Sequence, residues 1–144
     1  MVQNTGATTP SLKFSASDSV PARLAGVLVA LAGAAAPQSS GVAALRIMLR
    51  DAGKHRSPNA GWPESAMAGA LGIALAGPRR YAERVVDDPW LGDGRARVTP
   101  VDMHRALLVY AVACALQGAA ILALYLLLPE ASPHVPASGV RITV

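Results

Sequence analysis

The sequence predicts an all-α integral membrane protein, in which one full-length and one short transmembrane helix flank cytoplasmic amphipathic helices and loops. The composition favours this class, because 52% of the 144 residues are hydrophobic, only 15% are charged, and the mean hydropathy is +0.35. The apolar residues gather in two runs, residues 22–36 and 106–128, and amphipathic patterns alternate with proline- and glycine-rich loops between them. A chain of this length is expected to form one domain.

The charge and the cysteine content exclude several other classes of protein. The net charge is +4, but neither a dense basic face nor stacking aromatic residues accompany it, so we expect no nucleic-acid partner. The single cysteine, Cys114, excludes an intramolecular disulfide and a cysteine metal cluster. The first residues lack a charged segment followed by an apolar core, which predicts that there is no signal peptide.

The N-terminal part is expected to be disordered first and helical afterwards. Residues 1–19 are polar and aperiodic, which is typical of disorder, and Ser19–Pro21 then has the residues of a helix start. The apolar run 22–36 is shorter than the roughly 20 residues that a bilayer span requires. Three interpretations therefore stay open: a short span that Arg23 extends to the headgroups, a buried helix, or a helix in the membrane interface.

Two further helices are expected in the middle of the chain. Residues 42–52 alternate apolar and basic positions with helical spacing, and Gly53 is expected to end this helix in the left-handed conformation. Residues 64–76 carry a face of small residues, which predicts close packing against another helix. Residues 82–100 are predicted to form a polar loop.

The last helix is expected to start at Thr99 and to cross the membrane. Its 23 uncharged residues, 106–128, would reach roughly 35 Å, against roughly 30 Å of hydrocarbon. Gln117 lies in the middle, and its amide is expected to face a partner helix rather than lipid. Ten of the thirteen Lys and Arg residues lie between residues 37 and 105, which places the central loops in the cytoplasm. Residues 129–144 are predicted to be a flexible tail.

Most of the chemically active side chains gather in one stretch, residues 50–64, where prolines and glycines predict a built loop followed by a helix that starts near Pro63. Lys54 can hold a phosphate as a point charge, and His55 can transfer a proton near neutral pH. Asn59 can orient a carboxylate or an amide. The simpler alternative is that the polar residues only form turns and helix caps, while an aromatic residue anchors the loop in the interface.

Two acidic residues in the same stretch are candidate metal ligands. Asp51 or Glu64 can bind Mg²⁺, which prefers oxygen ligands and phosphate partners. Glu64 can also be a catalytic residue, or simply cap the following helix.

Farther along, Arg79, Arg80 and Tyr81 are candidates for binding an anion. Two neighbouring guanidinium groups can make bidentate contacts with a phosphate or carboxylate. A basic patch at a helix end, on the cytoplasmic side of the membrane, is an equally good interpretation.

The central stretch also carries a resemblance to a known family. The run Lys54-His-Arg-Ser-Pro-Asn-Ala-Gly-Trp-Pro-Glu64 is long and unusual, and residues 20–128 resemble the C-terminal part of the cobalamin biosynthesis family CobD/CbiB, the adenosylcobinamide-phosphate synthases. Further similar segments are Val20–Leu24, Ala66–Gly72, Gly77–Pro78, Tyr81 and Pro89–Gly94.

The resemblance implies a multi-pass enzyme of the bacterial inner membrane in vitamin B12 biosynthesis. Such enzymes are amide-forming ligases that join adenosylcobyric acid to aminopropanol phosphate, or to aminopropanol, with ATP and Mg²⁺. The product is adenosylcobinamide phosphate or cobinamide. The implied partners are a corrinoid substrate, the amino alcohol phosphate and membrane lipid.

The beginning of the chain departs from the family pattern. Family members are longer, with several membrane helices before this part, and residues 13–20 lack their usual acidic, asparagine-containing stretch. The chain is therefore expected to be a fragment or one half of a split protein, and to need an N-terminal partner chain or a homo-oligomer for activity. The alternative is a non-catalytic membrane remnant or a helix-packing subunit of a split synthase.

Overall fold

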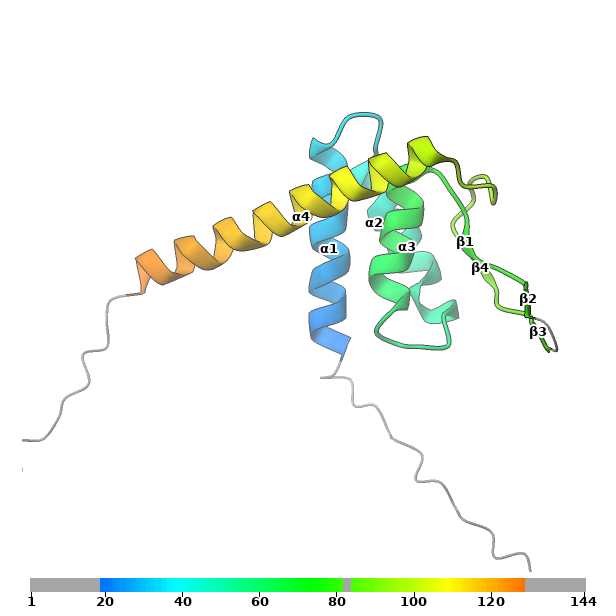
Figure 1. Cartoon of the computed structure of the whole chain (residues 1–144). Helices are drawn as coiled ribbons and strands as arrows, with labels where there is room; N and C mark the ends of the chain where they lie inside the picture. The colour runs from blue at the N-terminus through cyan, green and yellow to red at the C-terminus, as the bar shows by residue number, and fades with distance from the viewer. Residues whose placement is uncertain (1–18, 82–83, 129–144) are drawn as a thin grey trace, which may run out of the picture.

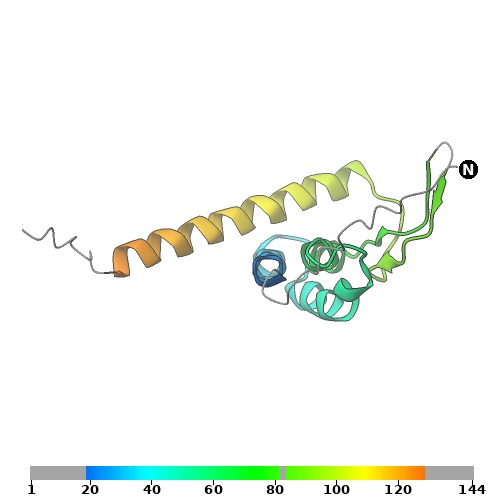
Figure 2. The same cartoon turned by 90° about the horizontal axis from the view of Figure 1, so that it is seen from below.

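The computed structural model describes residues 19–81 and 84–128, and the predictions of a disordered start and a flexible tail concern residues that lie almost entirely outside these ranges. Three helices stand side by side as a small bundle, and a fourth, longer helix crosses it (Figure 1). The bundle helices are α1 (Val20–Ala35), α2 (Gly41–Asp51) and α3 (Gly61–Leu71), and the long helix is α4 (Pro100–Leu127). Seen along the bundle, α4 lies against α1 and α3, on the side away from α2 (Figure 2).

The bundle helices begin and end where local chemistry satisfies their free backbone groups. Ser40 is the N-cap of α2, and its Oγ accepts a hydrogen bond of 3.2 Å from the backbone N–H of Ala43. Gly72 ends α3 in the left-handed conformation, with φ of 66°. The predicted amphipathic helix at 42–52 is thus confirmed within one residue, whereas Gly53 does not adopt a positive φ, because a short 3-10 turn, η2 (Ala52–Lys54), follows α2 instead.

Small residues hold the bundle together. A Cβ on Gly69 would stand 2.5 Å from the carbonyl oxygen of Ala43, and one on Gly41 would stand 2.5 Å from that of Ala30. Ten of the seventeen buried hydrophobic residues of the described chain are alanines. The predicted small-residue packing of the third helix is confirmed, and its partners are α1 and α2 of the same chain.

The third helix and the segment after it differ from the prediction. α3 spans Gly61–Leu71 rather than residues 64–76, because the left-handed Gly72 ends it early. The chain then forms β1 (Leu75–Ala76), which pairs antiparallel with β4 (Trp90–Leu91). Ala76 and Gly77 both have positive φ and turn the chain outward between the two ladders.

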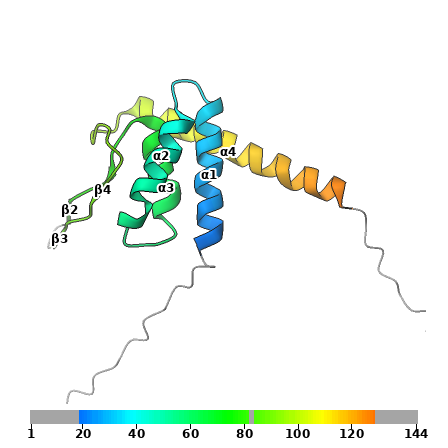
Figure 3. The same cartoon turned by 180° about the vertical axis from the view of Figure 1, so that it is seen from behind.

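The predicted loop at 82–100 is therefore wrong in part, and so is the all-α class. In addition to the first ladder, β2 (Arg79–Tyr81) pairs antiparallel with β3 (Arg84–Val86), and together the ladders form a narrow arm beside the helices (Figure 3). β-branched and aromatic residues such as Val86 and Trp90 favour extended backbone, even in short runs.

The long helix begins as predicted. Thr99 and Asp102 form a capping box, and Asp102 also accepts a hydrogen bond of 2.6 Å from Arg95. Arg105 donates to the carbonyl of Gln38, which ties the first turn of α4 to the α1–α2 loop.

Among the described helices, only α4 is long and apolar enough to cross a membrane. Only 11% of its most apolar window is buried, so it is not a core helix of this bundle. α1 has 16 residues, fewer than a full span requires; it buries one side in the bundle and exposes large apolar residues such as Leu24 and Leu31 on the other.

Candidate functional site

The carboxylate of Asp51, at the end of α2, anchors one end of the bundle. Its side chain is fully buried, and both oxygens receive hydrogen bonds from Arg50, at 2.7 and 2.6 Å. Lys54 lies 2.7 Å from Oδ1, and the backbone N–H of Gly92 donates to Oδ2 at 2.8 Å. The hydrogen bonds from Arg50 are the largest cause that holds the pKa of Asp51 well below its ordinary value, so this carboxylate stays ionised.

The same end of α2 holds the segment that follows β4. Arg50 donates to Asp93 at 2.6 Å, and Arg46 lies 3.8 Å from the same oxygen. The hydrogen bond from Arg50 lowers the pKa of Asp93. Segments about forty residues apart in sequence therefore meet around Asp51, and η2 carries Lys54 directly beside them.

His55 and Glu64 face each other across the central loop. His55 Nε2 lies 3.5 Å from a Glu64 carboxylate oxygen, and the Nδ1 atom accepts a hydrogen bond of 2.9 Å from the backbone N–H of Ser57. Nδ1 also lies 3.1 Å from the carbonyl oxygen of Ser57, so the contacts of the ring fit either neutral tautomer. The sequence predicted both residues as candidates, and the structure brings them together.

The loop approaches the first turn of α3 so closely that only glycine fits there. A Cβ on Gly61 would collide with the carbonyl oxygen of Ala52 and would stand 3.0 Å from the Cβ of His55. Next to it, Asn59 Oδ1 is buried and accepts no hydrogen bond from the described part of the chain. The orphaned oxygen can accept a hydrogen bond from a bound molecule, in keeping with the orienting role predicted for Asn59.

The two candidate metal ligands differ in how they fit Mg²⁺. Asp51 offers no free oxygen, because Arg50, Lys54 and Gly92 occupy both of them. Glu64 is 43% exposed and can supply one oxygen, which is compatible with a metal held mainly by substrate phosphates and water. No group of three or more His, Cys, Asp or Glu side chains that could hold a metal occurs among the described residues.

The predicted anion cradle lies apart from these residues. Arg79 and Arg80 are exposed on β2, and Arg79 lies 3.9 Å from Asp88. Tyr81 is the last residue of that strand and pairs with Arg84. In the described ranges no hydrogen bond, ion pair or cavity joins this arm to Lys54, so the two predicted groups are not brought together.

A cavity of about 350 Å³ opens between α1, α3 and α4, and Glu64 is one of its lining residues. Its lining is almost entirely apolar. The polar side chains that reach it besides Glu64 are Tyr110 and Gln117 of α4. Only the fold brings these α4 residues near the loop, so their sequence positions do not reveal the connection. The one signal in the sequence is Gln117, a polar residue within an apolar run.

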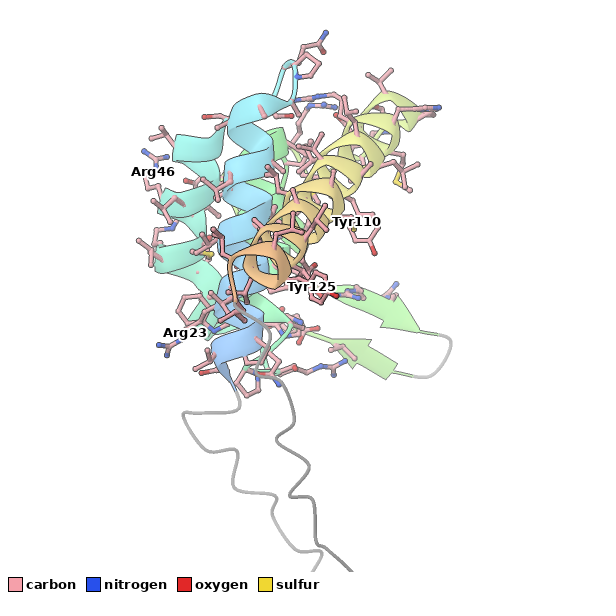
Figure 4. The ribbon with its side chains drawn as sticks, turned by 90° about the vertical axis from the view of Figure 1, so that its left-hand side faces the viewer. Arg23, Arg46, Tyr110 and Tyr125 are labelled. Carbon is pink, nitrogen blue, oxygen red and sulfur yellow. The ribbon has the colours of Figure 1, made fainter. Side chains whose placement is uncertain are left out.

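Arginine and tyrosine side chains mark two sides of the molecule (Figure 4). Tyr110 and Tyr125 project from α4, whereas Arg46 lies on α2 at the opposite side. Arg23 stacks on the ring of Trp62, 4.7 Å from its centroid, which fixes the first turn of α1 against that of α3. The aromatic ring predicted to anchor the loop thus has a partner within the chain.

Comparisons with known proteins point to one family. Residues 16–110 match the family model described as CobD/Cbib protein. The chain is 50% identical over 91 residues to a protein of Rhodobacter capsulatus named cobalamin biosynthesis protein CobD, a match that covers 63% of this chain and 27% of that protein. A protein of the same name from Brucella suis is 50% identical over 93 residues, covering 63% and 28%. One from a Sinorhizobium species is 44% identical over 108 residues, covering 73% and 33%.

The chain therefore spans only about a quarter to a third of the length of these curated relatives. No solved structure matches it.

Proposed function

The chain belongs to the CobD/CbiB family, and from this premise we propose that it supplies part of a membrane enzyme of cobalamin biosynthesis. The reaction would be the ATP-dependent ligation of adenosylcobyric acid with aminopropanol phosphate, or aminopropanol, to give adenosylcobinamide phosphate or cobinamide. The observation that carries the proposal is the grouping of Lys54, His55 and Glu64 at one end of the bundle, inside the segment that matches the family.

The chemistry consists of two displacements. An oxygen of the substrate carboxylate attacks the γ-phosphorus of ATP, ADP leaves, and an acyl phosphate forms. The amine nitrogen then attacks the acyl carbon, the bond from carbon to the phosphate oxygen breaks, and the amine loses a proton. Mg²⁺, when bound, would neutralise charge on the phosphates, and of the two candidate ligands Glu64 is the one with a free oxygen.

Lys54 is proposed to hold the transferred phosphoryl group. Its ammonium has three donors, and the contact with Asp51 uses one of them while the side chain stays 44% exposed. Asp51 therefore positions the ammonium of Lys54, and the remaining N–H donors of Lys54 can bind a phosphate.

The His55–Glu64 pair is proposed to take the amine proton. Nδ1 of His55 contacts the backbone of Ser57, so Nε2 of His55 and the carboxylate of Glu64 are the two groups of the pair left to take the proton. Asn59 is proposed to orient the carboxylate or the nascent amide through its buried oxygen. Arg79, Arg80 and Tyr81 are proposed to contact a different, anionic part of the substrates, since they stand on the β arm.

We further propose that the protein resides in the bacterial cell membrane, with α4 as a span and the central loops in the cytoplasm. The excess of arginine and lysine before the apolar part of α4 supports this orientation.

Complementation of a strain that lacks the synthase tests the proposal. The chain is supplied alone and together with the remaining portion of the Rhodobacter capsulatus relative. We expect rescue with that portion, and loss of rescue by Lys54→Ala or His55→Ala while membrane insertion is unchanged. The exposed neighbour Arg56 provides the matched control, because Arg56→Ala should rescue normally.

Failure of rescue in both settings would contradict the proposal. Rescue that survives both loop substitutions would instead favour a helix-packing subunit without catalytic residues, which is the second candidate. The short coverage of the relatives is the observation in favour of that candidate.

A further inference from the structure

We infer that the cavity between α1, α3 and α4 is a docking groove for an apolar membrane helix of the polypeptide that carries the rest of a CobD-type protein. The inference rests on the proposed function, because that function requires the missing part. The inference adds the surface where that part binds and the kind of side chain that its helix needs at the contact.

The groove has the composition of an interface between membrane helices. It is about 350 Å³ in volume, and its walls come from one face of α1, the first turns of α3 and the middle of α4. The lining residues are Ala25, Leu28, Val29, Pro63, Glu64, Met67, Leu75, Tyr110, Ala113, Cys114 and Gln117. Alanines and medium-sized apolar side chains let another helix approach closely.

Gln117 shows that lipid alone is a poor cover for this groove. Its side chain lies in the apolar part of α4, and it takes part in none of the hydrogen bonds of the described residues. An amide that faces hydrocarbon without a partner costs several kcal/mol, and acyl chains offer no donor or acceptor. A helix with a polar side chain opposite Gln117 satisfies the amide and fills the apolar walls at the same time.

The length of the relatives identifies the occupant. The match covers 27% of the Rhodobacter capsulatus protein, so nearly three quarters of that protein lies outside the matched segment. The apolar window of α4 is only 11% buried, and Tyr110, on the face that lines the groove, is 62% exposed. A helix of the partner therefore has room beside α4 on this face.

The position of Glu64 connects the groove with the candidate site. Glu64 lines the groove and also faces His55. A helix seated in the groove would therefore form one wall beside Glu64 and limit the access of water to it.

Cys114 provides a direct test, because it lines the groove and is the only cysteine of the chain. A nitroxide label on Cys114, in the full chain in lipid vesicles, reports mobility and oxygen accessibility by electron paramagnetic resonance. The partner probe is the Rhodobacter capsulatus relative without the 91 residues that match. We expect an immobilised label with at least a severalfold loss of oxygen accessibility when this probe is co-reconstituted.

Ala115 gives the matched control position at the same depth. It is exposed on α4 and does not line the groove, so the label is moved there by Ala115→Cys in a Cys114→Ala background. This label should respond much less to the partner. An equal response at both positions, or none at position 114, would overturn the inference, as would dipolar broadening between labels without the partner, which indicates a second copy in the groove.

A second measurement addresses the amide itself. Gln117→Leu should weaken the association with the probe by roughly three- to twentyfold, the range of interhelical hydrogen bonds in membranes. Ala115 lies two residues before Gln117 and does not line the groove, so Ala115→Leu should leave the association with the probe unchanged. Unchanged binding of Gln117→Leu would remove the hydrogen-bond argument and, with it, the inference.

The two proposals fail in different ways. Association without rescue of the synthase-deficient strain would leave the groove assigned and reject the catalytic function. Rescue by a covalent fusion of the two parts, with no response of the label on Cys114, would support the function and reject the groove.

Discussion

At the scale of single residues, Asp51 is the most heavily engaged side chain near the candidate site. It is buried, and it accepts from two basic side chains and one backbone N–H that come from separate parts of the chain. Both cations remain partly exposed, so they lose little hydration while the carboxylate loses nearly all of its own. Removal of the negative charge would leave the two cations facing each other.

We therefore expect Asp51→Asn to lower the free energy of unfolding by about 1–3 kcal/mol, because an amide N–H₂ cannot accept from Arg50 or Lys54. Thermal unfolding in detergent micelles, followed by circular dichroism, measures the change. Asp93→Asn is the matched control: Asp93 contacts Arg50 as well, but it is 55% exposed, and its replacement should matter much less.

The lowered pKa of Asp51 also predicts how the stability of the chain depends on pH. The pKa of Asp51 is lowered on folding, so its contribution to stability is present above the pKa of the unfolded state, about 4, and is lost as the pH falls toward the folded value. As the pH falls below about 5, the free energy of unfolding of the wild-type chain should therefore decrease more steeply than that of Asp51→Asn. Equal slopes would contradict the anchoring role.

Several residues of the site were predictable from the sequence, and others were not. Lys54, His55 and Glu64 stand close enough in sequence that a proline-pinned loop must hold them near one another. The occupation of Asp51 by its neighbours was not predictable, because Gly92 approaches from about forty residues away. The contact of His55 with the backbone of Ser57 depends on loop geometry in the same way.

At the scale of secondary-structure elements, the contact between the η2 turn and the start of α3 decides the shape of the loop. Gly61 packs against the backbone of Ala52, and residues 55–60 form the loop between these two points. Any side chain at position 61 must push the turn and the helix apart, and His55 would move away from Glu64 with the turn.

Gly61→Ala is expected to destabilise the chain by about 1–3 kcal/mol, because a methyl group has to displace backbone atoms. Gly53→Ala is the control from the same loop: nothing lies within 4 Å of its Cβ position and its φ is not positive, so it should be neutral or stabilise by up to about 1 kcal/mol. Urea unfolding of both variants compares them. A smaller effect at position 61 than at position 53 would show that the close approach is not maintained in solution.

The helices were more predictable than the strands for a physical reason. The amphipathic period of α2 and the capping box of α4 are local signals, written within a few residues. The β1–β4 ladder joins Leu75 with Leu91 and arises only when α3 ends at Gly72. Strands of two or three residues carry too little pattern to be told from loops.

At the scale of the whole molecule, the bundle and the long helix have different environments. The bundle buries its small residues within the chain, whereas α4 passes across α1 and continues beyond it (Figure 1). The prediction of one full-length span is compatible with this arrangement, and the topology of the chain in the membrane remains a prediction.

A charge in the exposed part of α4 should therefore impair insertion specifically. Leu116→Arg is expected to raise the free energy of insertion by about 2.5–3.5 kcal/mol, because it places a guanidinium near the middle of the hydrocarbon. A glycosylation acceptor appended to the C-terminus, with translation in the presence of microsomes, measures the inserted fraction. Leu49→Arg, on the exposed face of α2 at 67% exposure, should leave glycosylation unchanged.

The alanine-rich interior described above has a thermodynamic consequence. A buried methyl group removes far less apolar surface from water than a leucine side chain, so the bundle gains its cohesion from backbone proximity. Unfolding exposes correspondingly little hydrocarbon, and the heat-capacity increment per residue should fall below the usual 12–15 cal/mol/K. The free energy of unfolding of such a fold therefore changes only gently with temperature, and it stays small across the whole range.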